Sequence, residues 1–168
     1  MRVLIGAGVM LEPQMAAHAP ELFAVLREPR LYDYLDDAPP HDEESVRARI
    51  TKLESRLSPD GSEHWLNWIV RPADGALVGY VQATVYPDHL ADIGYVIGIG
   101  HQRRGLAFAA MSAMLDELAA SYEVTRLRAM VDPDNAGSVA LLRKLGFTRT
   151  GGVEAGPLAD IGFERSLP

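Results

Sequence analysis

The residues best placed to do chemistry together form the segment Gln102-Arg103-Arg104-Gly105-Leu106-Ala107, which joins a strand-like apolar run to a long amphipathic stretch. A helix that begins near Leu106 exposes backbone N–H groups and the positive end of its dipole, an arrangement that suits a diphosphate. Gly105 lets the backbone approach a phosphate closely, and the two arginines add hydrogen-bond donors and positive charge. A solvated turn is the alternative, because short glycine motifs often match by chance. The position between a strand and a helix favours a phosphate-binding loop.

The elements that must position this loop follow from hydrophobic periodicity and turn residues. In the N-terminal half we expect strands over 3–12, 65–71 and 76–86, and helices over 21–28 and 42–57. In the C-terminal half we expect strands over 92–99, 125–131, 147–150 and 159–166, and helices over 107–122 and 138–145. Hairpins come early and a β-α-β-α-β order comes late, which indicates a mixed α/β (α+β) domain. A doubly wound fold would alternate strand and helix from the start, and a sandwich would lack the long helices.

Length, charge and composition narrow the class of protein. With 168 residues the chain fits one domain, 1–168. Its net charge of −7 disfavours generic binding to nucleic-acid phosphate or anionic lipid, and no apolar run approaches the ~20 residues of a membrane span. Because the chain has no cysteine and its five histidines show no ligand spacing, we expect neither disulfides nor a metal site. We read 3–12 as a strand rather than a signal peptide, and expect a cytoplasmic protein.

Three segments together resemble the GNAT superfamily of acyl-CoA N-acyltransferases, and in particular its branch that acetylates ribosomal-protein N-termini. They are Asp92-Ile93-Gly94-Tyr95, the loop 102–107, and the stretch 135–147, which ends in Leu-Gly-Phe. The family's pyrophosphate loop reads Gln/Arg-x-x-Gly-x-Gly/Ala, and the loop here matches it. The resemblance implies the GNAT fold, with about seven strands in a twisted, mostly antiparallel mixed sheet that splays apart between strands four and five, and about four helices. It also implies direct transfer of an acetyl group from acetyl-CoA to a primary amine in a ternary complex.

The same resemblance assigns residues to acetyl-CoA. Backbone groups of Ile97 and Ile99 are expected to pair with the pantetheine amides as an added strand would, and Asn135 is expected to contact the pantetheine arm. The pyrophosphate would be held by Gln102, Arg103, Arg104, Gly105, Leu106 and Ala107. No metal is implied.

Catalysis needs a group that takes a proton from the amine and a group that serves the departing thiolate. In the resembling branch a Glu commonly stands where this chain has Asp92, so Asp92 is the expected base, acting through water because Asp is shorter. The alternative role of Asp92 is structural, as a carboxylate that bonds to a backbone N–H. Many family members place a proton-donating Tyr where this chain has Leu142, and Ser138 is the expected substitute. An early-helix hydrogen bond is the alternative role of Ser138, and unassisted departure of the thiolate is the third option.

The acceptor is expected to be a small-molecule amine or a protein N-terminus, and a homodimer is an open option because dimers are common in the branch. The loop after the first helix carries Tyr32, Asp33, Tyr34, Asp36 and Asp37. In the GNAT fold this region walls the acceptor site, where it would receive a cationic amine unless it is a solvated loop. Two other functions stay open. A catalytically silent acyl-CoA-binding regulatory module would explain the missing Tyr, and an aminoacyl-tRNA-dependent transferase would need a basic face that the acidic balance disfavours.

Overall fold

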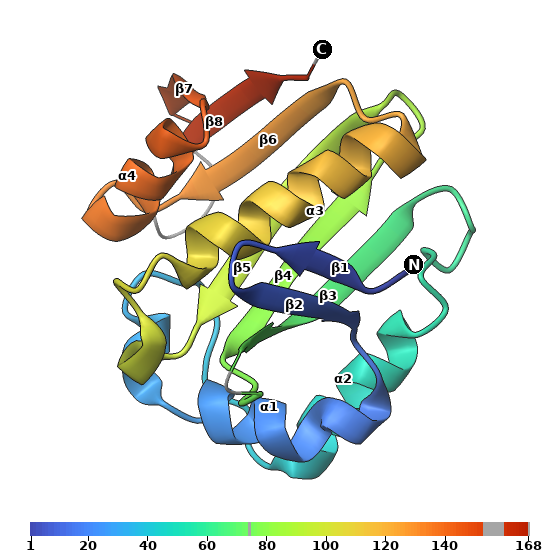
Figure 1. Cartoon of the computed structure of the whole chain (residues 1–168), viewed down its shortest axis with the longest axis vertical. Helices are drawn as coiled ribbons and strands as arrows, with labels where there is room; N and C mark the ends of the chain where they lie inside the picture. The colour runs from blue at the N-terminus through green and yellow to red at the C-terminus, as the bar shows by residue number, and fades with distance from the viewer. Residues whose placement is uncertain (74, 153–159, 168) are drawn as a thin grey trace.

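The centre of the molecule is one eight-stranded sheet with the order β1-β2-β3-β4-β5-β6-β8-β7, shown in Figure 1. The computed structural model describes residues 1–73, 75–152 and 160–167. The strands are β1 (Leu4–Gly6), β2 (Val9–Pro13), β3 (His64–Pro72), β4 (Gly79–Val85), β5 (Leu90–Ile97), β6 (Arg126–Val131), β7 (Thr148–Gly152) and β8 (Ile161–Ser166). Neighbouring strands pair antiparallel except β5 and β6, which are parallel. The expected mixed, mostly antiparallel sheet is confirmed.

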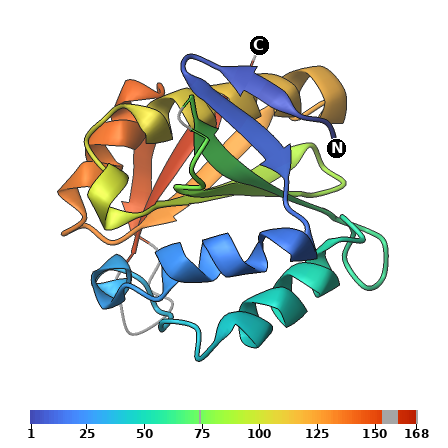
Figure 2. The same ribbon diagram turned by 60° about the horizontal axis from the view of Figure 1, so that its bottom comes forward.

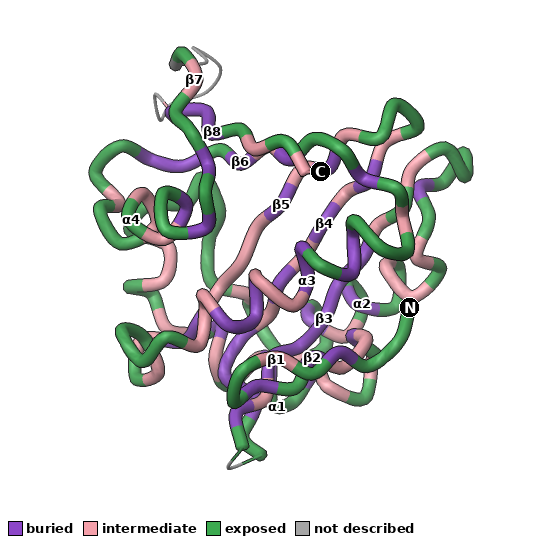
Figure 3. The backbone as a smooth tube through the Cα atoms, turned by 45° about the horizontal axis from the view of Figure 1, so that its top comes forward, coloured by how far each residue is buried: buried purple, intermediate pink, exposed green. Residues whose placement is uncertain are grey.

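Helices cover both faces of the sheet (Figure 2). In the described residues they are α1 (Ala19–Leu26), α2 (Glu43–Leu53), α3 (Leu106–Tyr122) and α4 (Ala136–Lys144). α1 and α2 pack on one face around Leu22 and Ile50, whereas α3 packs on the other face over a larger core that includes Trp68 and Phe163. Figure 3 shows how the buried residues gather along the central strands. Elements therefore pack on both faces of the sheet, and either face can contribute residues to a site.

The eighth strand arises at the N-terminus. The apolar run 3–12, expected to be one strand, is a hairpin in which β1 and β2 pair Leu4 with Leu11 and Gly6 with Val9. Gly8 has φ +76°, a left-handed conformation that a glycine adopts in a tight turn without steric cost. A continuous apolar run hides such a turn from hydrophobic periodicity, so the expectation of about seven strands is corrected to eight.

The sheet opens between β5 and β6. These strands pair only at Leu90 with Arg126, Ala91 with Leu127, and Asp92 with Arg128, although β5 continues to Ile97. Along the same length β5 stays paired with β4. The expected splay is confirmed, and it falls between the fifth and sixth strands because the N-terminal hairpin adds one to the count.

Element ends differ from the expectations by a few residues. α2 begins after its N-cap Asp42, whose Oδ1 accepts a hydrogen bond from the Ser45 N–H at 2.7 Å, and ends at Leu53 rather than at 57. β5 ends at Ile97, and Ile99 lies in a short 3-10 turn, η3 (Ile99–His101). The expected strand 159–166 begins at Ile161, and residues 153–159 lie outside the described ranges. No helix within those ranges combines the length and apolar character that a membrane crossing requires.

Candidate active site

A cleft of about 860 Å³ follows the opening between β5 and β6. One part, here called the phosphate-loop half, is lined by Ile97, Ile99, Gln102, Arg103, Gly105, Leu106, Ala107, Phe108, Asn135, Ser138 and Lys144. The other part, here called the acidic half, is lined by Arg30, Asp33, Tyr34, Asp36, Asp37, Arg49, Tyr80, Gln82 and Asp160. The structure thus brings most of the predicted site residues into one cleft.

The N-terminus of α3 opens into the phosphate-loop half. Gly105 is the N-cap, with φ +80° and no capping side chain, and the first intrahelical bond runs from the Ala109 N–H to the Gly105 carbonyl at 3.0 Å. The N–H groups of the three residues between them, all of which line the cleft, have no partner within the helix. A Cβ on Gly105 would meet no atom of the described residues within 4 Å apart from its chain neighbours. This open helix end fits a diphosphate group.

The rest of the loop holds this helix end in place. The Gln102 Nε2 donates to the Ile97 carbonyl at 3.0 Å, so the Gln102 side chain ties the loop to the end of β5. Arg103 has φ +63° and lines the cleft. The Arg104 side chain is exposed, with Nη1 at 3.4 Å from His101 Nδ1, and Arg104 does not appear among the described residues that line the cleft. The geometry therefore favours a phosphate contact for Arg103 over one for Arg104.

One edge of β5 faces the opening with its backbone. The Tyr86 N–H donates to the Leu90 carbonyl and the Gly98 N–H donates to the Val78 carbonyl, so alternate residues from Leu90 to Gly98 bond toward β4. Of the residues between them, Tyr95 and Ile97 lie beyond the last β5–β6 pair and direct their N–H and C=O groups toward the opening, where the Ile97 carbonyl also accepts from Gln102 Nε2. Ile99 has already left the extended conformation for η3. An added strand is thus offered by 95–97, whereas the predicted contact of Ile99 lacks an extended backbone.

Two hydroxyl groups meet across the opening. The Tyr95 hydroxyl donates to Ser138 Oγ at 2.8 Å, which leaves the Ser138 proton free for another acceptor. Burial raises the pKa of Tyr95, while its bond to Ser138 opposes that rise, so the phenol stays neutral and donating. The Asn135 Oδ1 caps α4 by accepting from the Ser138 N–H at 3.0 Å, and its Nδ2 has no hydrogen-bond partner among the described residues. Sequence reasoning gave Tyr95 no role, because its partner Ser138 lies 43 positions along the chain and no local pattern pairs the two.

Asp92 lies where β5 and β6 part. Its carboxylate accepts two bonds from Arg128, Nε to Oδ1 at 2.6 Å and Nη2 to Oδ2 at 2.7 Å, and one from the Tyr86 hydroxyl at 2.9 Å. The carboxylate raises the pKa of Arg128, and burial followed by the bond to Asp92 raises the pKa of Tyr86. Asp92 does not appear among the described residues that line the cleft. The geometry gives Asp92 a structural role in which its partners are side chains and not the expected backbone N–H. The role of Asp92 as the base stays a prediction.

Two cleft residues carry charge that sequence reasoning missed. Asp160 is half-buried, and burial, with the nearby charges of Asp132 and Asp36, raises the pKa of its carboxyl group. The Lys144 Nζ lies 4.2 Å from the centre of the Phe108 ring, which places a cation beside the first turn of α3. Neither residue belongs to a local motif, so only the fold brings them to the site. Within the described ranges, no group of three or more His, Asp or Glu side chains is placed to hold a metal ion.

Comparison with known proteins places this chain in a family. Residues 9–148 match the acetyltransferase (GNAT) domain. The chain is 28% identical over 126 residues to an uncharacterized N-acetyltransferase, p20, of Bacillus licheniformis, which covers 74% of this chain and 70% of that protein. It is 32% identical over 111 residues to the probable N-acetyltransferase YjcK of Bacillus subtilis (strain 168), which covers 64% of this chain and 60% of that protein.

Solved structures share the fold at lower identity. The ribosomal L7/L12 alpha-N-protein acetyltransferase RimL, in complex with coenzyme A, superposes with a TM-score of 0.86 at 21% identity and 98% coverage of both chains. Mycobacterium smegmatis RimJ in complex with CoA-disulfide gives 0.84 at 20% identity, covering 98% of this chain and 85% of that chain. The ribosomal-protein-S5-alanine acetyltransferase of Vibrio fischeri gives 0.82 at 17% identity, covering 98% and 96%. With the family match extending over most of its length, the chain belongs to the GNAT acetyltransferase family.

Proposed function

We propose that the protein transfers an acetyl group from acetyl-CoA to a primary amine while both are bound in the cleft. The observation that carries the proposal is the open N-terminus of α3 at Gly105, beside a strand edge with free backbone groups. Acetyl-CoA supplies a thioester carbonyl for direct attack by the amine. The coenzyme A complexes of RimL and RimJ support acyl-CoA as the donor here.

The phosphate-loop half binds the donor. The free N–H groups at the start of α3 and the guanidinium of Arg103 hold the pyrophosphate, with the charge of Lys144 nearby. The open backbone of 95–97 pairs with the pantetheine amides. The free Nδ2 of Asn135 donates to the pantetheine arm. These roles use backbone geometry more than side-chain identity.

The acidic half receives the amine and removes its proton. A base must reach the amine directly or through one water. Asp160 meets this requirement better than the predicted Asp92, because Asp160 lines the cleft and both oxygens of Asp92 are bonded to Arg128. The raised pKa of Asp160 also makes it the stronger proton acceptor once it is ionised.

The departing thiolate is served by Ser138. Its hydroxyl oxygen is occupied by the Tyr95 proton, so its own O–H is directed to a different acceptor, which we propose is the thiolate sulfur. Tyr95 acts by orienting Ser138. This pair does the work for which many relatives use a Tyr at the position of Leu142, a residue only 2% exposed.

An acetylation assay by mass spectrometry tests the proposal. The protein would be incubated with acetyl-CoA and a panel of amines, including polyamines, amino-acid amides and peptides with free N-termini. The ribosomal-protein acetyltransferases of the same fold make a protein N-terminus a strong member of the panel. Acetylation of any panel amine supports the transferase. Acetyl-CoA binding without turnover of any amine would instead support the silent regulatory module.

A further inference from the structure

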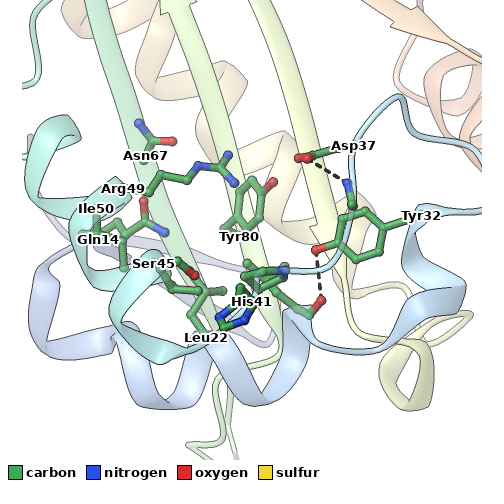
Figure 4. A pocket seen from close by; sticks show the side chains of 14 residues that line it. Gln14, Leu22, Tyr32, Asp37, His41, Ser45, Arg49, Ile50, Asn67 and Tyr80 are labelled. Atoms are coloured by element: carbon green, nitrogen blue, oxygen red, sulfur yellow. Dashed lines mark hydrogen bonds between the residues drawn. The ribbon is translucent and has the colours of Figure 1, made fainter. Parts of the chain in front are cut away.

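A second cavity of about 240 Å³ lies behind the acidic half, enclosed by α1, α2, the loop 37–41 and the sheet. Figure 4 shows Gln14 and Arg49 gathered with Asn67 and Tyr80 around one space. We call it the amide pocket, after the side chains of Gln14 and Asn67. Tyr80, Arg49 and Asp37 line both this pocket and the main cleft, so the two spaces share a wall.

The two amides are buried but not satisfied by the protein. Gln14 is 4% exposed and Asn67 is 5% exposed. The Gln14 side chain has no hydrogen-bond partner among the described residues, and Asn67 has one weak bond, from Nδ2 to the Trp65 carbonyl at 3.4 Å. No fully enclosed side-chain polar atom in the described ranges lacks a partner. The free amide atoms therefore open onto the pocket.

Two other polar side chains around the pocket are already engaged. The Tyr32 hydroxyl donates to the Leu26 carbonyl at 2.9 Å, and the Ser45 hydroxyl donates to the Asp42 carbonyl at 2.6 Å. The rest of the lining combines apolar side chains, such as Leu22, Val46 and Ile50, with the oppositely charged Arg49 and Asp37 and with His41 and Tyr80. The two amides therefore need partners within the pocket, from water or from a ligand, because an unmade hydrogen bond of a buried amide is costly.

A primary amide offers both a donor and an acceptor but no charge. The complementary group is therefore neutral and can donate and accept as well, such as a hydroxyl or a carboxamide. We infer that the amide pocket takes the substituent next to the acceptor amine and selects a neutral hydrogen-bonding group there. The inference rests on the proposed function, because it treats the acidic half as the place of the reacting amine.

Isosteric acceptor pairs test the inference. Threoninamide and valinamide differ by a hydroxyl for a methyl, and asparaginamide and leucinamide differ by a carboxamide for an isopropyl group. The wild-type protein should prefer the polar member by about tenfold or more in kcat/KM, because the apolar member leaves the amides unpaired. The variants Asn67→Leu and Gln14→Leu should each reduce that ratio at least about threefold while leaving the thermal shift with acetyl-CoA unchanged. Thr84→Val, on the same sheet face but outside the described pocket lining, is the matched control and should keep the ratio.

Binding of the same amides, measured by thermal shift in the presence of coenzyme A, gives a second readout that does not need turnover. Equal binding of both members of each pair, with no effect of either Leu variant, would overturn the inference and leave the transferase intact. A preference for the α-amide of aspartic acid that is lost in Arg49→Met would also overturn the inference. The pocket would then select a negatively charged group. A selective binding response without acetylation of any amine would sustain the pocket and contradict the proposed function instead.

Discussion

The two halves of the cleft are built from different parts of the chain. The phosphate-loop half uses main chain, namely the free N–H groups that follow Gly105 and the open edge of β5. The acidic half uses side chains from separate elements, such as Asp36, Arg49, Tyr80 and Asp160. Backbone donors bind one chemical group, a phosphate or an amide, whatever the neighbouring side chains are. Under the proposed function, donor binding depends on local backbone geometry, and acceptor choice depends on side chains that are distant in the sequence.

Asp160→Asn should give the largest effect on turnover. Removal of a base lowers kcat by about 10²-fold or more. The same change should raise the melting temperature at neutral pH. An acid whose folded-state pKa is raised contributes stability below its unfolded pKa, and this contribution is lost as the pH rises through the folded pKa. Melting curves at neutral and acid pH, with kcat at neutral pH, measure both effects. Full activity in this variant would remove Asp160 from the reaction.

Ser138→Ala should lower kcat by about 10- to 100-fold, the value of one hydrogen bond to a charged sulfur. The KM for acetyl-CoA should change little, because the bond forms to the departing thiolate. Tyr95→Phe should lower kcat about tenfold or less, since it removes only the group that orients Ser138. Steady-state kinetics on both variants and on the double variant check the assignment. A double variant whose loss equals the product of the single losses would show that the two residues act independently.

Asp92→Asn should affect stability more than turnover. The variant loses a paired carboxylate at the point where β5 and β6 separate, and because the pair is half-exposed we expect about 1 kcal/mol. That corresponds to a melting temperature lower by roughly 2–4 °C for a chain of this size. We expect kcat to fall no more than about threefold. A fall of about 100-fold with an unchanged melting temperature would instead establish the predicted role of Asp92 as the base.

Lys144→Met should have the smallest effect. Loss of one exposed cation near the start of α3 should raise the Kd for acetyl-CoA about threefold at low salt, and less at high salt. Lys52→Met, at an exposed position of α2, is the matched control and should leave the Kd unchanged. Titration calorimetry at two ionic strengths measures the difference. An equal effect of both variants would mean that the charge acts through the net charge of the protein and not at the site.

The sequence predicts the phosphate-loop half well because its information is local. The strand, the loop and the helix that form it are consecutive in the chain, whereas the left-handed φ of Gly105 was found only in the structure. The mixed sheet followed from the order of elements, and the splay followed from the resemblance to the GNAT superfamily. The N-terminal hairpin did not, because its turn at Gly8 interrupts an unbroken apolar run.

The loop 33–37 lies in the acidic half, as the resemblance implied, but the surroundings of Asp92, Asp160 and the amide pocket could not be predicted in the same way. The partners of Asp92 include Arg128, 36 positions along the chain, and no spacing rule pairs them. Gln14 and Asn67 come together because β2 lies beside β3, which required the hairpin to be known. Asp160 gains its raised pKa from burial and from neighbours on other elements. Each of these properties comes from tertiary packing and not from local pattern.

The most direct test of the account is a thermal-shift titration with acetyl-CoA on wild type, Gly105→Glu and Gly61→Glu. Both glycines have positive φ, +80° and +74°, and a Cβ on either would meet no described atom within 4 Å beyond its chain neighbours. The two variants therefore carry similar backbone strain, and only Gly105 lies in the cleft. At about 100 times the Kd, ligand stabilises the folded state by about 2.7 kcal/mol, and the melting temperature should rise by several degrees.

We predict this rise in wild type and in Gly61→Glu, and its loss in Gly105→Glu, because the new carboxylate occupies the phosphate position at the start of α3. An undiminished shift in Gly105→Glu, or the absence of a shift in folded wild-type protein at millimolar acetyl-CoA, would contradict the assignment of the cleft.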